Sequence, residues 1–207
     1  MADQYYTRQP GSESHPTECS FTYRGKELRF MTDTGIFSRG ELDTGTRLLI
    51  EAFPESMGRE ILDMGCGWGP IGISVKAAWP ETRVTMVDVN LRALDWSREN
   101  AKRNGTEVEV IESDGFAALV GRSFDAVITN PPIRAGKQVI YRMFAEAKEH
   151  LKPGGSLYLV IRKQQGAESC MKYLKTLYAS VEKLDRSGGF WVLRATDGFD
   201  TVSEAMV

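Results

Sequence analysis

From Glu60 onward, short runs of apolar residues alternate with segments in which apolar residues recur at the helical period of three to four. The strand-like runs cover residues 61–63, 84–88, 108–111, 124–129 and 157–161. The helical stripes cover residues 71–79, 91–104, 139–151 and 169–178. Strands that alternate with helices in this way predict an α/β fold, in which a doubly wound parallel sheet is built from right-handed crossovers.

Both ends of the chain depart from that alternation. At the C-terminal end, strand-like runs at 181–184 and 190–193 flank a short connection with two glycines, which predicts an antiparallel hairpin and brings the sheet to seven strands. Near the N-terminus, runs at 20–23 and 28–30 flank Arg24-Gly25-Lys26 and predict a second hairpin. A helix through residues 48–53 follows, with Asp43 or Thr44 as its N-cap.

The length of 207 residues is that of a single domain with one core. We expect the segment 20–58 to pack on the sheet as an N-terminal lid, and the segment 59–196 to form the core that carries the chemistry. The polar ends, 1–19 and 197–207, are expected to be flexible.

Composition excludes several classes of protein. Hydrophobic residues make up 42% of the chain and charged residues 26%, which is ordinary for a soluble globular domain. Three isolated cysteines and two histidines offer neither a disulfide framework nor a metal site, so no metal is expected. No run of 18 apolar residues occurs and the N-terminus is polar, which predicts a cytoplasmic protein without a membrane partner.

Charge is distributed unevenly along the chain. The net charge is −2, but residues 120–175 hold ten basic and four acidic residues, a net of +6, so the remainder carries −8. A basic flank of this kind could face phosphate groups. Lysines on a solvated helix surface are the alternative explanation.

The most specific chemistry lies in Asn130-Pro131-Pro132-Ile133, directly after the apolar run 124–129. Proline lacks an N–H and biases the preceding residue towards extended backbone, so we expect carbonyls at this strand end to have no ladder partner. An amide oxygen beside a free carbonyl suits an exocyclic NH2 group, because its two N–H bonds need two acceptors. A tight loop that closes a βα unit is the alternative.

Glycines and carboxylates follow the first three strands of the alternating region. Asp63 leads into the loop 64–69, whose glycines allow a tight turn and a close approach of the backbone to a ligand. Asp88 ends the second strand, 25 residues later, where a carboxylate can accept from ribose hydroxyls. Asp114 follows the third strand, in position to accept from an adenine amine. Three carboxylates suit a ligand with an ammonium and a sulfonium better than one with a pyrophosphate, although capping of the next element also explains Asp63 and Asp114.

Together these motifs resemble those of class I S-adenosylmethionine-dependent methyltransferases that modify exocyclic nitrogens. The upstream segment 35–45, Gly-Ile-Phe-Ser-Arg-Gly-Glu-Leu-Asp-Thr-Gly, is similar to the "small" methyltransferase (MTS) domain of RsmC-type 16S ribosomal RNA guanine-N2 methyltransferases. The resemblance runs from about Phe21 to Ala195 and implies a Rossmann-like methyltransferase fold with S-adenosylmethionine as the cofactor.

The resemblance also implies roles for individual residues. Asp63 would hold the methionine ammonium, Asp88 the ribose and Asp114 the adenine amine, with Phe37 and the turn that begins at Asp43 over the methionine end. The full set of implied cofactor contacts is Phe37, Asp43, Asp63, Gly65, Cys66, Gly67, Asp88, Val89, Asp114 and Asn130.

Asn130, Pro131, Pro132 and Ile133 form the predicted catalytic group. The Asn130 side-chain oxygen and the Pro131 carbonyl would accept both N–H bonds of the amine and aim its lone pair at the methyl group. In relatives an aromatic residue commonly follows the two prolines and stacks on the base. Because this chain has Ile133 there, Phe37 or Phe190 would have to supply the stacking.

The expected partner is RNA, either ribosomal RNA or an assembling small subunit. Unstacking a base is cheap in single-stranded or loop RNA. Arg134 and Lys137, just beyond the prolines, are predicted phosphate contacts, and Arg162 and Lys163 are predicted at the same edge of the sheet, after the fifth strand. An ordinary charged helix start is the alternative for the first pair.

Three other functions stay open on the sequence. The same motif serves methylation of adenine N6, cytosine N4 or a protein glutamine. A dinucleotide oxidoreductase is compatible with the glycine loop and Asp88, but the Asn-Pro-Pro motif and the terminal hairpin argue against it. The third is a non-catalytic RNA-binding or assembly module on the same scaffold.

Overall fold

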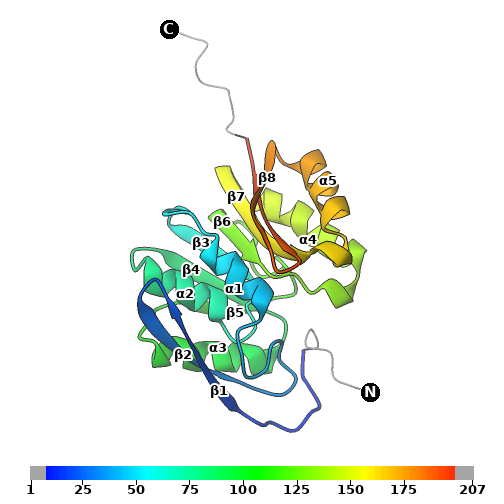
Figure 1. Cartoon of the computed structure of the whole chain (residues 1–207). Coiled ribbons are helices and arrows are strands. Elements are labelled where there is room, and N and C mark those ends of the chain that lie inside the picture. The colour runs from blue at the N-terminus through cyan, green and yellow to red at the C-terminus, as the bar shows by residue number, and fades with distance from the viewer. Residues whose placement is uncertain (1–7, 199–207) are drawn as a thin grey trace.

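The computed structural model describes residues 8–198, and its centre is a seven-stranded sheet (Figure 1). In spatial order the strands are β5 (Glu109–Glu112), β4 (Arg83–Asp88), β3 (Glu60–Met64), β6 (Phe124–Thr129), β7 (Leu151–Arg162), β9 (Phe190–Thr196) and β8 (Ser180–Ser187). Strands β5 to β7 are parallel, whereas β9 pairs antiparallel with both β7 and β8. The predicted doubly wound, mostly parallel sheet with a C-terminal hairpin is thus confirmed.

Helices cover both faces of the sheet (Figure 1). One face carries α1 (Thr44–Glu51), α2 (Pro70–Ala78) and α3 (Leu91–Arg103), and the other carries α4 (Lys137–Glu149) and α5 (Ala167–Leu177). Successive side chains of a strand point to opposite faces, so Ile61 packs in one hydrophobic cluster and Leu62 in the other. Two short 3₁₀ helices, η1 (Ile133–Ala135) and η2 (Lys163–Gln165), were not foreseen.

The predicted N-terminal hairpin is present and longer than expected. Strands β1 (Thr17–Tyr23) and β2 (Lys26–Thr32) pair over their full length, from Thr17 opposite Thr32 to Tyr23 opposite Lys26. The turn residues Arg24 and Gly25 both have positive φ, as two-residue hairpin turns require. Residues 17–19, at the end of the segment 1–19 that is expected to be flexible, lie in this ladder, and the first seven residues of that segment fall outside the described range.

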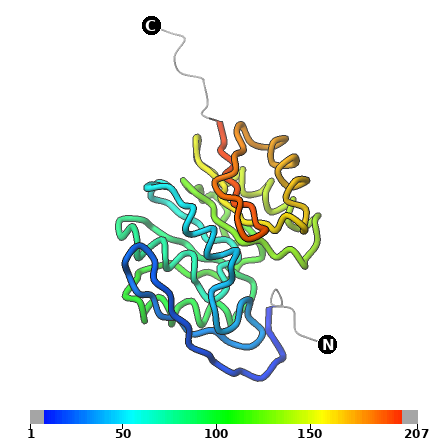
Figure 2. Tube along the Cα trace, in the orientation of Figure 1, coloured from blue at the N-terminus to red at the C-terminus, as the bar shows by residue number. Residues whose placement is uncertain are grey.

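The hairpin is held against the core by aromatic packing and by two asparagines. Phe30 stacks on Phe21 and meets the edge of Trp68, with ring centroids 5.1 and 5.0 Å apart. From α3, Asn100 accepts from the Met31 N–H and donates to the Met31 carbonyl, and Asn104 makes the same two bonds with Arg29. The trace in Figure 2 shows this N-terminal segment running alongside the α2 and α3 side of the sheet.

The start of β7 differs from the sequence expectation. Leu151 was predicted as the last residue of a helical stripe, but α4 ends at Glu149 and Leu151 pairs with Phe124 of β6. The reason is the glycine pair that follows, which permits a bulge between this pair and the regular register from Ser156 onward. The main run of the strand, through Ile161, lies where the sequence predicts it.

The strand order indicates which edge of the sheet binds a ligand. The chain moves outward from β3 through β4 to β5, then returns to β6 on the other side of β3. In open α/β sheets the crevice outside the carboxyl ends of the strands, at such a switch point, is where ligands bind. Asp63, Asp88 and Asn130 lie at or next to the carboxyl ends of β3, β4 and β6.

Candidate active site

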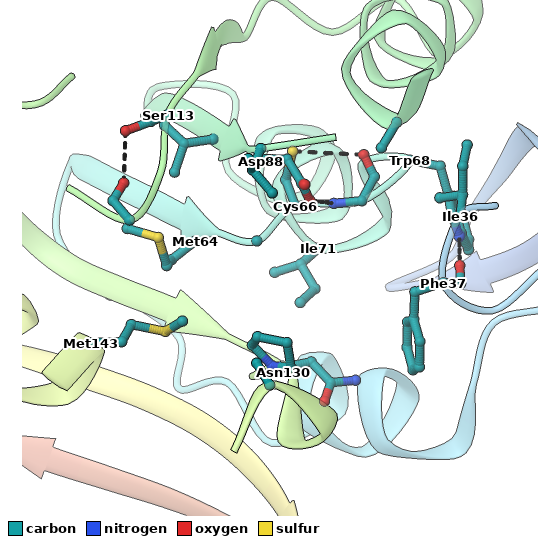
Figure 3. A pocket seen from close by; sticks show the side chains of 18 of the residues that line it. Ile36, Phe37, Met64, Cys66, Trp68, Ile71, Asp88, Ser113, Asn130 and Met143 are labelled. Atoms are coloured by element: carbon teal, nitrogen blue, oxygen red, sulfur yellow. Dashed lines mark hydrogen bonds between the residues drawn. The ribbon is translucent and has the colours of Figure 1, made fainter. Parts of the chain in front are cut away.

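A cavity of about 460 Å³ opens at this switch point, a volume typical of small-molecule sites. Loops after β3, β4, β5 and β6, the segment before α1 and one side of α4 form its walls. Figure 3 shows Ser113 and Met143 at one end and Phe37 at the other, with Asn130 between them. Residues of the predicted site in its wall are Phe37, Asp43, Gly65, Cys66, Gly67, Asp88, Val89, Asp114, Asn130 and Pro132.

The glycine loop turns under this cavity. Gly65, Gly67 and Gly69 have φ of 72°, 56° and 92°, in the left-handed region that favours glycine. A Cβ on Gly65 or Gly67 would meet no protein atom within 4 Å, so the bare backbone borders open space.

Internal hydrogen bonds occupy the N–H groups of that loop. Gly65 and Cys66 donate to the Val87 carbonyl at 2.9 Å, and Gly67 donates to Asp88 Oδ2 at 2.8 Å. Gly69 donates to the Cys66 carbonyl. A pyrophosphate needs such N–H groups free, so the arrangement counts against the dinucleotide alternative.

Asp63 lies behind the loop and is completely buried. Its Oδ2 accepts from the Gly72 N–H of α2 at 2.8 Å, while Oδ1 has no partner among the described residues. Burial raises the pKa of Asp63 to about 7, opposed by the Gly72 bond and reinforced by the nearby Asp88. Asp63, predicted to hold the methionine ammonium, lies outside the cavity wall, and its role stays a prediction.

Asp88 and Asp114 occupy the wall as predicted. Asp88 is held by two backbone N–H groups, from Gly67 at 2.8 Å and Asn90 at 2.9 Å, which fix its carboxylate at the end of β4. Burial raises the pKa of Asp88, and these hydrogen bonds oppose the rise. Asp114 is exposed after β5, next to Ser113 and Gly115. The two acids thus flank the part of the cavity nearest β4 and β5.

Phe37 closes the opposite end from the segment between β2 and α1. Its side chain is 40% exposed, although Phe is usually buried, and it faces the cavity (Figure 3). The Trp68 indole N–H donates to the Phe37 carbonyl at 3.0 Å, and Asn90 donates to the Gly35 carbonyl at 3.0 Å. The segment is therefore anchored by its backbone while the ring stays accessible.

Asn130 is oriented by the N-terminus of α1. Its Nδ2 donates to Thr46 Oγ1 at 3.0 Å and to Asp43 Oδ1 at 3.4 Å. Asp43 is the predicted N-cap, and its Oδ1 also accepts from the Gly45 and Thr46 N–H groups. Because both acceptors face the nitrogen, the Asn130 Oδ1 accepts no hydrogen bond within residues 8–198, and Asn130 itself lines the cavity.

The residues after Asn130 differ from the prediction in two ways. The Pro131 carbonyl is not bare, because the Ile133 N–H donates to it at 2.8 Å in a tight turn just before η1. Pro131 is buried outside the cavity wall. Ile133, half-buried, packs against the hydrophobic cluster beneath α4 and also lies outside the wall. Of the three residues that follow Asn130, only Pro132 lines the cavity.

One side of α4 belongs to the site and was missed from sequence. Val139, Arg142, Met143 and Glu146 line the cavity, and their spacing of three and four places them on one helix face. Arg142 pairs with Glu146 at 3.5 Å. The signal was available, since this face of the helix follows directly after the Asn-Pro-Pro motif.

The predicted RNA contacts fall into two groups. Arg134 and Lys137 are exposed at η1 and the start of α4. Arg162 and Lys163 are exposed at the junction of β7 and η2, where Arg162 lies over the Phe190 ring, 4.8 Å from its centroid. None of the four forms an ion pair within the described part of the chain.

Two general features bear on the class of site. Between residues 8 and 198, no helix is both long and apolar enough to cross a membrane. Over the same range, no group of three or more His, Cys, Asp or Glu residues is arranged to hold a metal ion.

The sequence is similar to known methyltransferases. The methyltransferase small domain model matches residues 27–194. A Bacillus subtilis protein, YbxB, whose name gives no activity, is 42% identical over 199 residues, 94% of this chain and 98% of that protein. The ribosomal RNA small subunit methyltransferase C of Hahella chejuensis is 43% identical over 137 residues, 64% of this chain and 40% of that protein.

A solved structure agrees with these matches. The Thermus thermophilus 16S rRNA N2 G1207 methyltransferase RsmC, in complex with AdoMet and guanosine, superposes with a TM-score of 0.80 at 26% identity. The match covers 91% of this chain and 52% of that one, so the chain spans about half the length of the RsmC proteins it matches. With a family model over most of its length, the chain belongs to the methyltransferase small domain family.

Proposed function

We propose that the protein transfers the methyl group of S-adenosylmethionine to the N2 amine of a guanine in small-subunit ribosomal RNA. The observation that carries the proposal is the orientation of Asn130. Its nitrogen is held by Thr46 and Asp43, so its oxygen is left as an acceptor between the acids after β4 and β5 and the exposed Phe37.

The cavity has the groups that the cofactor requires. Asp88 and Asp114 would hold the ribose and the adenine amine, and the bare glycine backbone leaves room beside them. Asp63, with one unpartnered buried oxygen behind the loop, would favour the positive charge of the methionine ammonium through the loop rather than by contact. When bound, S-adenosylmethionine supplies the methyl group, and its sulfonium is a good leaving group.

The amine has to be positioned rather than deprotonated beforehand. An exocyclic amine is a weak nucleophile, because its lone pair is delocalised into the ring. Asn130 Oδ1 would accept one N–H bond of the amine, whereas the Pro131 carbonyl, outside the cavity wall, accepts from the Ile133 N–H instead. Such positioning can supply on the order of 7–11 kcal/mol in the best intramolecular cases.

The base itself would be gripped by apolar surface. Ile133, half-buried against the core, lies outside the cavity wall, so the stacking role falls to Phe37 and Pro132, which both line the cavity. Val139 is 38% exposed and lines the cavity from α4. A flipped guanine stacked on an aromatic ring is the usual arrangement in enzymes that modify bases.

The choice of guanine rests on relatives. Both the Hahella and the Thermus proteins are named as small-subunit ribosomal RNA methyltransferases, and the latter structure contains guanosine. Their similarity to this chain covers the half that carries the Asn-Pro-Pro motif.

The test is transfer of a deuterated methyl group from S-adenosylmethionine by the purified protein. Small subunits and free 16S RNA from a strain lacking the gene would be the acceptors, followed by mass spectrometry of the nucleosides. We expect deuterated N2-methylguanosine. Label in N6-methyladenosine or N4-methylcytidine would identify another base as the substrate, and label in a glutamine of the subunit proteins, found by peptide mass spectrometry, would identify a protein. No label with intact cofactor binding would favour the non-catalytic assembly role.

A further inference from the structure

A second hollow, of about 320 Å³, lies at the tip of the β8–β9 hairpin and has no role in the proposed reaction. It is lined by Lys163, Arg186, Ser187, Gly188, Gly189, Phe190 and Trp191, which we call the hairpin hollow. Its two cations come from different elements, Lys163 from η2 and Arg186 from β8.

The hairpin hollow opens at the same edge of the sheet as the active site. Strand β6 ends at Thr129, which pairs with Leu159, and β7 continues to Arg162, opposite Phe190. β9 is two strands from β6, a lateral distance of about 10 Å at the usual strand spacing. The hollow is thus within reach of the backbone of an RNA whose base occupies the cavity.

A continuous set of contacts links the hollow to Asn130. Phe190 packs so closely on Gly45 that an added Cβ there would lie 3.0 Å from the ring. A Cβ added to Gly188 would likewise lie 3.6 Å from the Thr44 side chain and 3.7 Å from the Leu48 side chain of α1. The first turn of α1, which orients Asn130 through Thr46, therefore also packs against residues that line the hollow.

The charge of the hollow is not neutralised by the protein. Lys163 and Arg186 are exposed and form no ion pair within residues 8–198, and Arg162 makes only its contact with the Phe190 ring. The acid next to Arg186, Asp185, accepts from the Arg186 backbone N–H at 2.7 Å and from the Ser187 hydroxyl at 2.6 Å.

From this placement we infer that the hairpin hollow binds the sugar-phosphate backbone of the RNA strand next to the methylated nucleotide. Lys163 and Arg186 would contact phosphates, and the exposed turn Ser187 to Gly189 would let the strand approach the backbone closely. Contacts of this kind fix the register of the RNA without reading its sequence. The inference rests on the proposed function, because it takes RNA as the substrate.

The test compares Lys163→Ala/Arg186→Ala with the control Lys172→Ala/Lys175→Ala, which removes the same charge from exposed positions on α5. The probe is a fluorescein-labelled single-stranded 16S RNA fragment, titrated at several salt concentrations. We expect the hollow variant alone to bind at least tenfold more weakly, with the slope of log K against log salt reduced by about 0.7 per lost contact. Its S-adenosylmethionine affinity should equal that of the wild type.

The outcomes separate the two claims. If the wild type methylates RNA and the hollow variant binds and methylates it equally well, the hollow has no role and the proposed function stands. If methyl transfer to RNA falls while binding and transfer to free guanosine hold, a structural effect on the RNA complex other than phosphate contact is indicated and the inference fails. If the wild type binds no RNA and methylates only protein, both claims fail.

Discussion

The proposed chemistry depends on the side-chain amide of one residue, Asn130. Replacing it in Asn130→Ala removes the acceptor without touching Asp88 or Asp114, which line the cofactor end. We expect kcat to fall on the order of 100-fold or more, the usual loss when one positioned hydrogen-bonding group at a reacting centre is removed. Calorimetry should show unchanged S-adenosylmethionine affinity, and near-normal turnover would show that this amide does not hold the substrate.

Thr46 acts on the same amide from behind. Its hydroxyl accepts from the Asn130 Nδ2, so Thr46→Val, which keeps the shape, leaves the amide held only by its longer bond to Asp43. We expect kcat to drop about five- to tenfold, equivalent to the roughly 1 kcal/mol of a net hydrogen bond, with little change in the cofactor KM. Thr46→Ser keeps the hydroxyl and should restore kcat; equal losses in both variants would indicate a packing effect instead.

Asp63 gives the stability of the free protein a dependence on pH. Burial raises its pKa from an unfolded value of 3.8 to about 7, so the folded state holds a proton that the unfolded state has lost. Stability contributed by this proton is complete below pH 4 and is lost as the pH rises through 7, at up to roughly 1.4 kcal/mol per pH unit. Burial also raises the pKa of Asp88, which makes stability depend on pH in the same direction.

Urea unfolding at pH 5 and pH 8 measures this dependence. Asp63→Asn keeps an acceptor for the Gly72 N–H and removes the titration, so the variant should lose less stability between the two pH values than the wild type. Equal losses would place the titrating group elsewhere.

At the scale of elements, two asparagines on α3 make the same pair of bonds to β2 at different depths. Asn100 is completely buried and also donates to the Trp68 carbonyl, whereas Asn104 is half-buried at the end of the helix. Removing a buried partner leaves unsatisfied backbone groups, at about 1–3 kcal/mol each. Asn100→Ala should therefore reduce the free energy of unfolding by more than Asn104→Ala. The reverse order in urea unfolding would contradict the view that the bonds of Asn100 hold β2 on α3.

The elements were predicted well from the sequence and the contacts between them less well. The runs of apolar residues predicted the strands, because a strand that is buried on both faces consists mostly of apolar residues. It also misplaced Leu151, since an apolar residue beside a glycine pair suits either a helix end or a bulged strand. The hydrogen bonds between Asn100 and Met31 were not foreseen, because partners 69 positions apart in the sequence leave no local pattern.

The site shows the same division. Carboxylates at strand ends and Asn130 were predicted, because parallel strands bring their carboxyl ends to one edge. The sequence showed neither that Pro131 accepts from Ile133 nor that Ile133 packs against the core, since both depend on the turn that leads into η1. Thr46 was missed for a similar reason: it meets Asn130 across 84 positions.

At the scale of the whole molecule, cofactor binding should stabilise the fold. Its contacts would come from the loops after β3, β4 and β5 and from the segment before α1, which all line the cavity, so the ligand would join the lid to the core. S-adenosylmethionine at 100 times its Kd should raise the free energy of unfolding by about 2.7 kcal/mol. Thermal unfolding with and without the cofactor measures this, and an unchanged midpoint would mean that the cavity binds another ligand.

The central claim is methylation of guanine N2 in ribosomal RNA through Asn130. The most direct measurement is mass spectrometry of 16S RNA nucleosides from a strain lacking the gene, complemented with the wild type or with Asn130→Ala. The account predicts that N2-methylguanosine is reduced without the gene, restored by the wild type and not restored by the variant, although both proteins are expressed equally. Unchanged N2-methylguanosine in all strains, or restoration by Asn130→Ala, would contradict it.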